Sequence, residues 1–292
     1  MKTPVLVYVC ILLAMIFWGF SFVWSSIALE TLQPFSVLVV RLVIATPLLF
    51  LFAFFSGRLQ KIGKQDFLPL FLLALFEPFL YFIGETYGLK ETTPTVTSVV
   101  IATIPLFVPV AAWIFLRDRI SIMNFIGIFL SVGGVVVISA DKAFILSFSG
   151  LMLLLLAVFS AVAYTVTLKK LADKYNAWTL VAYQNLIGII LFLPLFLVFD
   201  HNHISISDFK INTIYSLLLL AIFGSSLAFV FFAYSVRHLG VNRSSVFGNL
   251  IPVLTAVFAY FVVSEPISWQ KILGIIIVVS GVLLSQLKLR QS

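Results

Sequence analysis

The chain has one cysteine, Cys10, and three histidines among its 292 residues. A lone cysteine excludes an intrachain disulfide, and the sequence has no cysteine and histidine spacing typical of zinc, so we expect no metal and no cofactor. It also lacks the H-E-x-x-H, G-x-S-x-G and G-x-x-x-x-G-K-[ST] patterns of zinc proteases, serine nucleophiles and nucleotide phosphate cradles. These absences argue against an enzyme and against transport powered by ATP bound to this chain.

Charge is scarce and apolar residues are abundant. Charged residues make up 10% of the chain and hydrophobic ones 62%, and the mean hydropathy is +1.18. Such a composition suits an all-α membrane protein rather than a soluble core. The net charge of +7 does not point to nucleic acid, because the basic residues sit in short gaps between apolar runs. The expected partners are the lipid bilayer and a small-molecule solute.

Ten apolar runs are long enough to be membrane helices at about 1.5 Å per residue. A signal peptide is the alternative for the first run, since Lys2 precedes it and small residues follow. That run is longer than the apolar region of a usual signal peptide and has a partner later in the chain, so we interpret it as a membrane helix. The predicted helices span residues 5–28, 34–55, 67–89, 94–115, 121–139, 148–169, 177–199, 213–236, 241–263 and 268–287.

The basic residues predict the orientation of these helices. Thirteen of the 18 lysines and arginines fall at ends and loops on the side of the N-terminus, four fall in the opposite loops, and Arg41 lies inside a helix. The positive-inside rule therefore places both termini in the cytoplasm. A bacterial cytoplasmic membrane is the expected location.

The two halves of the chain repeat each other at an offset of 147 residues. Because each half holds five helices, the second half must enter the membrane in the opposite orientation. Inverted repeats of this kind are typical of transporters, with the solute site near the midplane between the halves. We therefore predict two repeats, 1–139 and 148–287. The matched pairs are Tyr87 with Tyr234, Ser98 with Ser245, Pro105 with Pro252, Asp118 with Glu265, Ile120 with Ile267, Ser121 with Ser268, Gly127 with Gly274 and Gly134 with Gly281.

These residues carry a resemblance to a known family. The first half, with Trp18-Gly19, Arg41, Tyr87-Gly88-Leu89, Ile104-Pro105-Leu106 and the loop from Arg117 to Ser121, resembles one half of an EamA-type permease of the drug/metabolite transporter superfamily. The second half repeats the pattern, but Ser160-Ala161 replaces a second Trp-Gly pair and Gln184 replaces a second arginine. The resemblance implies ten helices in two inverted repeats that move small organic solutes, often exporting amino acids or other metabolites.

The third predicted helix carries two carboxylates, Glu77 and Glu85. With Tyr81 between them they follow the i, i+4, i+8 spacing, so the three side chains share one helix face. A charge at the centre of a membrane helix costs about 2.5–3.5 kcal/mol on insertion scales, so it normally faces a bundle interior or a water-filled cavity. We predict that this face is one wall of the solute cavity.

Arg41 is the natural partner of Glu85, because their predicted depths below the outer surface agree at about 10 Å and about 6 Å. We expect an ion pair between them. It either neutralises two buried charges or forms an extracellular gate.

Glu77 lies deeper, at about 18 Å, with no basic residue at a matching depth. It is the predicted energy-coupling or substrate-sensing carboxylate. The alternative is a protonated acid that bonds a carbonyl freed by Pro78.

The remaining candidates are weaker signals. Asn249 is the preferred amide contact for a solute, and Pro105 and Pro252 are predicted hinges, although kinks also serve simple packing. Trp18, Tyr164 and Gln184 are candidates for the cavity wall. The hydroxyl pairs Thr97-Ser98 and Ser244-Ser245 either line the cavity or bond their own backbone.

Together these features predict a secondary transporter of small organic solutes, most simply an exporter of amino acids or related metabolites with possible proton coupling. The alternative is a membrane receptor, a scaffold or an unrecognised intramembrane enzyme that moves no solute.

Overall fold

The structure is a computed structural model that describes residues 5–116, 122–139 and 147–285. The described residues form helices and short connections, without strands. The predicted loop from Arg117 to Ser121 and the basic residues of both termini lie outside the described residues.

The first half contains α1 to α7. Its third span is broken by a wide helical turn, η2, and its fourth is divided into α5 and α6. The bounds are α1 Val5–Leu29, α2 Pro34–Phe55, α3 Phe67–Ala74, η2 Leu75–Leu80, α4 Tyr81–Lys90, α5 Pro94–Ile101, α6 Ile104–Leu116 and α7 Ile122–Ser139.

The second half contains α8 to α14, and its third and fourth spans are broken in the same places. The bounds are α8 Phe148–Ala172, α9 Ala177–Leu195, η3 Phe196–Asp200, α10 Ile211–Leu219, η6 Leu220–Leu227, α11 Ala228–Leu239, α12 Val241–Val246, η7 Phe247–Asn249, α13 Leu250–Val263 and α14 Trp269–Ser285.

The described chain has the length and surface of a membrane bundle. Eight helical segments of the described residues are long and apolar enough to cross a bilayer, and α7 and α14 hold two shorter apolar stretches. The outside of the bundle exposes large apolar side chains such as Phe55, Phe129 and Phe261. Such a surface would be costly in water but is matched by lipid. The predicted all-α membrane fold is confirmed.

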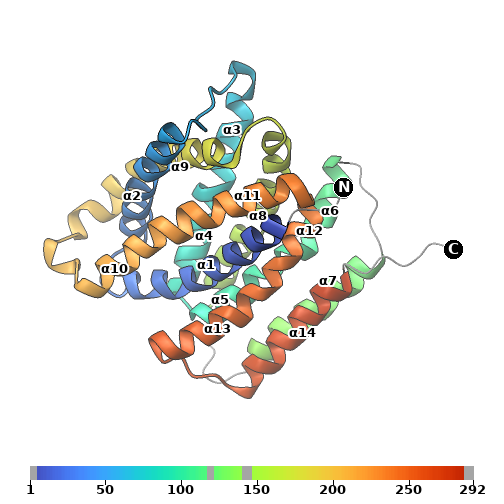
Figure 1. The fold of residues 1–292 in the computed structure, drawn as a ribbon. Helices are drawn as coiled ribbons and strands as arrows, with labels where there is room; N and C mark the ends of the chain where they lie inside the picture. Colours follow the sequence, from blue (N-terminus) through green and yellow to red (C-terminus); the bar gives the residue numbers. More distant parts are fainter. Residues whose placement is uncertain (1–4, 117–121, 140–146, 286–292) are drawn as a thin grey trace.

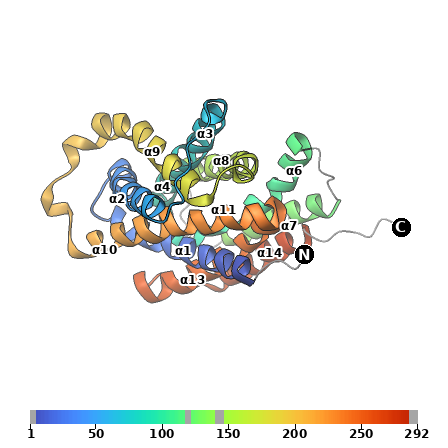
Figure 2. The ribbon, with the colours of Figure 1, turned by 45° about the horizontal axis from the view of Figure 1, so that its top comes forward.

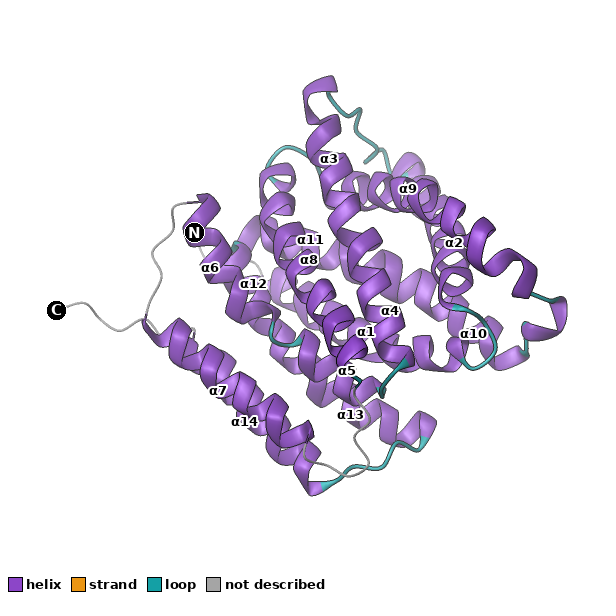
Figure 3. Cartoon of the chain, turned by 180° about the vertical axis from the view of Figure 1, so that it is seen from behind, coloured by secondary structure: helices purple, strands orange, loops and turns teal. Residues whose placement is uncertain are grey.

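The packing repeats when the two halves are exchanged. The contact of α4 with α8 has its counterpart in α11 with α1, that of α6 with α8 in α13 with α1, and that of α2 with η6 in α9 with η2. The fifth helices of the halves, α7 and α14, lie side by side at one edge (Figures 1 and 3), while α1 and α11 run together through the middle (Figure 2). The chain is thus ten membrane helices in two inverted five-helix repeats; the boundaries 1–139 and 148–287 stay a prediction.

Prolines lie at the break in the third span of the first half and at the breaks in both fourth spans. Glu77, before Pro78, has φ −149° and ψ 119°, which is extended rather than helical, because a residue that precedes proline is crowded out of the helical region. Pro105 and Pro252 stand in the first turns of α6 and α13. There the missing N–H costs nothing, since the first turn has no helical acceptor for it.

Polar bonds fix the helix ends. The Nζ atom of Lys174 lies 2.7 Å from Asp66 Oδ1, and the Tyr175 hydroxyl donates to Asp66 Oδ2 at 2.8 Å. The hydrogen bond to Asp66 raises the pKa of Lys174. At the other end, Asp200 accepts bonds from the backbone N–H and the hydroxyl of Ser36 in the first turn of α2. A carboxylate there satisfies otherwise unpaired N–H groups.

The two halves come into close backbone contact at Gly84. A Cβ added to Gly84 would come within 2.8 Å of the Ala157 nitrogen, and still closer to the Leu153 carbonyl oxygen of α8. A side chain of any size therefore separates α4 from α8.

We predict that Gly84→Ala lowers the free energy of unfolding by about 1–3 kcal/mol, the usual cost of overpacking. Thermal unfolding of the detergent-solubilised protein measures the loss. The control is Gly133→Ala in α7, because nothing lies within 4 Å of the added Cβ. Equal unfolding temperatures for the two variants would contradict close packing of α4 on α8.

Candidate functional site

A cavity lies between the two repeats. The first repeat contributes walls from α1, α2, η2 with α4, and the α5–α6 break, and the second contributes α8, α11 and the α12–α13 region. The space open to the centre of a water-sized sphere is about 70 Å³, which is room for about five waters. Its polar or ionisable side chains are Trp18, Ser21, Arg41, Glu77, Tyr81, Glu85, Tyr164, Thr165 and Ser245.

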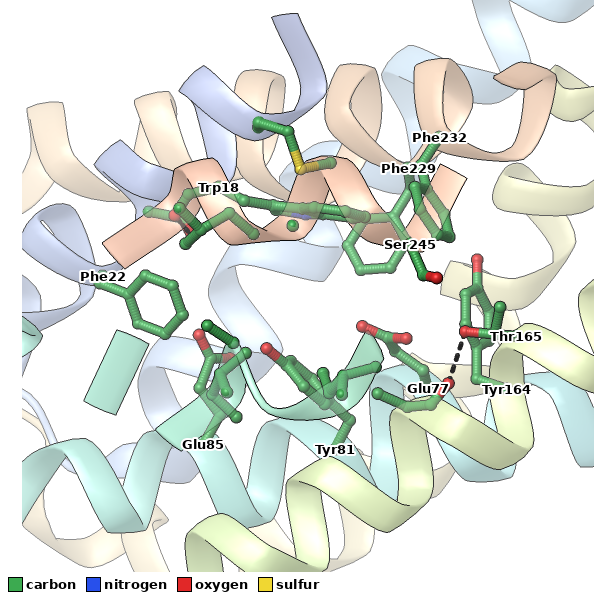
Figure 4. A pocket seen from close by; sticks show the side chains of 18 of the residues that line it. Trp18, Phe22, Glu77, Tyr81, Glu85, Tyr164, Thr165, Phe229, Phe232 and Ser245 are labelled. Atoms are coloured by element: carbon green, nitrogen blue, oxygen red, sulfur yellow. Dashed lines mark hydrogen bonds between the residues drawn. The ribbon is translucent and has the colours of Figure 1, made fainter. Parts of the chain in front are cut away.

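The polar groups of the cavity fall into two regions. Figure 4 shows Glu85 beside Phe22 at one end and Glu77 facing Tyr164 and Thr165 at the other, with Tyr81 between the two carboxylates. The predicted shared face of Glu77, Tyr81 and Glu85 is therefore present in the structure, and it forms one side of the cavity.

Arg41 does not form the predicted ion pair with Glu85. Both side chains are described and both line the cavity, but neither takes part in any ion pair in the structure. The Arg41 Nε atom instead donates to the Ser225 hydroxyl at 2.7 Å, and the guanidinium carbon lies 4.2 Å from the centroid of the Phe82 ring. A hydrogen bond and a cation–π contact thus position the guanidinium.

This arrangement leaves the guanidinium and the carboxylate each with an unpaired atom. Arg41 is 2% exposed and Glu85 4% exposed, yet Arg41 Nη1 and Glu85 Oε2 have no hydrogen-bond partner. Buried polar atoms are nearly always bonded, so two unpaired atoms of opposite charge at one cavity indicate a place for a ligand or water.

The broken helix of the second repeat creates the Arg41 site. A Cβ on Gly224 would lie 3.5 Å from Arg41 Nη2, an ordinary van der Waals distance, so the guanidinium packs directly beside the backbone of this turn. Asn185 Nδ2 donates to the Ser225 carbonyl at 2.9 Å and holds this turn in place.

Glu77 lies at the broken helix of the first repeat, is 6% exposed and faces the cavity (Figure 4). Its carboxylate forms no hydrogen bond or ion pair with any group in the described part of the chain, including the carbonyls near Pro78. An acid bonded to a freed carbonyl is therefore not what the structure contains.

Aromatic rings form the apolar wall of the cavity. Trp18 packs edge-on against Phe229, with ring centroids 5.2 Å apart, and lies 5.1 Å from the Phe232 ring. The Tyr164 ring meets Phe229 edge-on at 6.2 Å. The predicted wall positions of Trp18 and Tyr164 are thus occupied as expected.

Three predicted residues lie outside the cavity lining. Gln184 and Asn249 are buried, and all four of their side-chain amide atoms lack partners. Asn249 directly follows Gly248, which lines the cavity. Of the two predicted hinge prolines, Pro105 lines the cavity and Pro252 does not. The hinge roles stay predictions.

The hydroxyl pairs Thr97-Ser98 and Ser244-Ser245 are predicted either to line the cavity or to bond their own backbone, and their members differ in this respect. Ser98 and Ser245 donate to backbone carbonyls of their own helices. Thr97 and Ser244 are buried with unpaired hydroxyls. Only Ser245 of the four lines the cavity.

The sequence reasoning missed Ser225, Gly224 and Phe82. The 147-residue offset holds the missing signal, because it maps Glu77-Pro78 onto Gly224-Ser225. A break in one repeat therefore predicts a break in the other. Phe82, an ordinary apolar residue of α4, carried no signal.

Comparisons with known proteins agree with this architecture. The profile of the EamA-like transporter family matches residues 5–140 and again residues 148–287. An uncharacterized transporter of Archaeoglobus fulgidus is 32% identical over 284 residues, 96% of each chain. A WAT1-related chloroplastic protein of Arabidopsis thaliana is 28% identical over 88% of this chain and 64% of its own length. One solved crystal structure superposes with a TM-score of 0.73 over 96% of both chains at 15% identity, which is a likeness of fold.

We predict that Ser225→Ala lowers the free energy of unfolding by about 1.5–3 kcal/mol, because the buried Arg41 Nε–H loses its acceptor. Thermal unfolding in detergent measures the effect. The matched control is Ser226→Ala, since the Ser226 hydroxyl donates only to the Ala221 carbonyl. Equal losses in both variants would show that Ser225 does not hold the guanidinium.

Proposed function

This chain belongs to the EamA-like transporter family, and on that premise we propose that it exports amino acids or related metabolites without ATP. It is an integral membrane protein that binds a small solute. We place it in a bacterial cytoplasmic membrane with both termini in the cytoplasm, which reporters fused to each terminus would check. The distribution of basic residues supports this orientation.

One observation carries the choice of an amino acid. Arg41 Nη1 and Glu85 Oε2 are unpaired atoms of opposite charge on residues that line the same cavity. A free amino acid has a carboxylate that fits the guanidinium and an ammonium group that fits the carboxylate. Both buried charges then gain a partner, which a neutral solute cannot supply.

The aromatic wall suits the rest of such a solute. Trp18, Phe229 and Phe232 form an apolar surface next to the charged end of the cavity. Pockets for small solutes combine a mostly apolar lining with a few placed polar groups. A receptor, a scaffold or an intramembrane enzyme would not require two unpaired buried charges at a cavity between two inverted repeats.

We predict that proteoliposomes containing this protein move apolar amino acids at least about tenfold faster than the matching amines or carboxylic acids. An analogue that lacks one charge leaves Arg41 or Glu85 unpaired, and such sites reject analogues strongly. Uptake of the three radiolabelled compounds is compared in empty and protein-loaded vesicles. Equal transport of the amine would exclude the amino-acid site, and no flux of any of the three compounds would contradict the export of apolar amino acids.

Glu77 is the proposed coupling residue. It is buried, has no fixed counter-charge and faces the cavity between the repeats, where inverted-repeat transporters place their sites. A carboxyl group of this kind can take up a proton on one side of the membrane and release it on the other. One pH unit supplies about 1.4 kcal/mol, or a tenfold solute gradient per proton.

We predict that Glu77→Gln abolishes accumulation driven by an imposed pH step, while the parent accumulates solute up to about tenfold per pH unit. The amide keeps the shape of the side chain but does not titrate. Glu30→Gln is the control, because Glu30 is exposed in the loop after α1. Undiminished accumulation by a folded Glu77→Gln protein would remove Glu77 from the coupling mechanism.

A further inference from the structure

A second group of unpaired polar atoms surrounds Glu77. The Tyr164 ring is 1% exposed and Gln184 is fully buried. The Gln184 amide lies within reach of the Tyr164 hydroxyl, yet neither has a hydrogen-bond partner of good geometry. Unpaired buried oxygen and nitrogen atoms of this kind normally hold a water or an ion.

The repeat symmetry places Gln184 beside the broken helix of Glu77. Arg41 and Gln184 are each the eighth residue of their helices, α2 and α9. As α2 packs on η6, so α9 packs on η2. One turn beyond Gln184, a Cβ on Gly188 would come within 2.6 Å of Pro78 Cγ. Residues 184 and 188 share a helix face, so Gln184 is directed toward the same turn of η2.

The two related positions differ in charge. In one, a fixed guanidinium sits against the broken helix at Gly224. In the other, the neutral Gln184 sits against the broken helix that carries the carboxylate of Glu77. The second position therefore has a negative charge and neutral oxygen atoms, but no fixed cation.

We propose that Glu77, the Tyr164 hydroxyl and the Gln184 carbonyl oxygen form a binding site for a small monovalent cation, a hydrated proton or Na⁺. Carboxylate, hydroxyl and carbonyl oxygens are the ligands that such hard cations prefer. Broken helices supply further backbone carbonyls to coupling ions in transporters with inverted repeats. The site is distinct from the amino-acid site at Arg41 and Glu85.

The charged and titratable groups around this site are few. Tyr81 and Glu85 follow Glu77 on the same span, α8 contributes Tyr164, and α2 contributes Arg41. From α9 comes the neutral Gln184, and α11 contributes Phe229 and Phe232 to the cavity. Arg41 and Glu85 act on Glu77 electrostatically, but Arg41 is held by Ser225 and Phe82, so contact with the Glu77 carboxylate is left to an exchangeable cation.

Separate sites change how coupling works. The ion and the amino acid occupy the cavity together. The ion at Glu77 changes the affinity for the amino acid at Glu85, because Tyr81 and the span formed by η2 and α4 connect the two carboxylates. This coupling role rests on the proposed function, whereas binding of the cation does not.

The test measures cation binding to purified protein in nanodiscs, without any transport. Thermal unfolding is recorded against Na⁺ concentration at pH 8 with constant ionic strength, and against pH from 8 to 5 without Na⁺. A ligand that binds the folded state raises the unfolding temperature. We expect either added Na⁺ or lowered pH to raise the unfolding temperature of the parent. The same change should not raise the unfolding temperature of Glu77→Gln.

Gln184→Leu and Tyr164→Phe identify the other ligands. Loss of a supporting ligand typically weakens metal affinity by about 10–100-fold, so both variants should shift the stabilisation to at least about tenfold higher cation concentration. Thr46→Val is the matched control, since Thr46 also has a buried unpaired hydroxyl but does not line the cavity. Glu85→Gln should leave the response in place.

Three results would overturn the site: no stabilisation of the parent by either cation, unchanged affinity in both Gln184→Leu and Tyr164→Phe, or a response lost in Glu85→Gln. A protein that binds the cation but moves no amino acid contradicts the proposed function and leaves this site standing. Amino-acid transport that depends on Glu77 but not on Tyr164 or Gln184 contradicts this cation site and leaves the proposed function standing.

Discussion

The structure depends on how three ionisable side chains are kept inside hydrocarbon. An uncompensated charge there is costly, and removing one member of a buried pair typically costs 3–5 kcal/mol. Arg41 is stabilised by the Ser225 hydroxyl and the Phe82 ring rather than by a carboxylate. Glu77 and Glu85 are left without a counter-charge in contact. A protein that only needed to fold would gain by pairing or replacing these groups, so their open arrangement points to ligands.

The broken helices make this arrangement possible. A continuous helix satisfies its own backbone and presents only side chains, whereas a break lets another helix approach the backbone itself. At η6 the Arg41 guanidinium packs beside the backbone of Gly224, and at η2 the turn at Glu77 and Pro78 receives α9. The same break, used once in each repeat, therefore produces two different environments. The proposed amino-acid and cation sites use these two environments.

The position of the cavity connects this chemistry to movement. Its walls come from both repeats, so a relative rotation of the halves would change access to Arg41, Glu85 and Glu77 together. The close contact of α4 with α8 at Gly84 joins one wall of each half. The α5–α6 break, next to Pro105, lines the same cavity, and its counterpart lies between α12 and α13. Unpaired groups and a shared cavity wall are what alternating access requires.

The sequence by itself determined the membrane fold and the two repeats, and it predicted the depths of Arg41, Glu77 and Glu85, because hydrophobic length, odd helix number and the rise per residue act along one axis. It brought Glu77, Tyr81 and Glu85 to one face by helical spacing alone. It failed for the Arg41–Glu85 pair, since equal depth fixes one coordinate and leaves rotation and lateral distance free. Only packing decided those two coordinates: α2 lies against the broken helix η6, where Arg41 donates to Ser225, and α9 repeats that position against η2, which directs Gln184 toward the turn of Glu77.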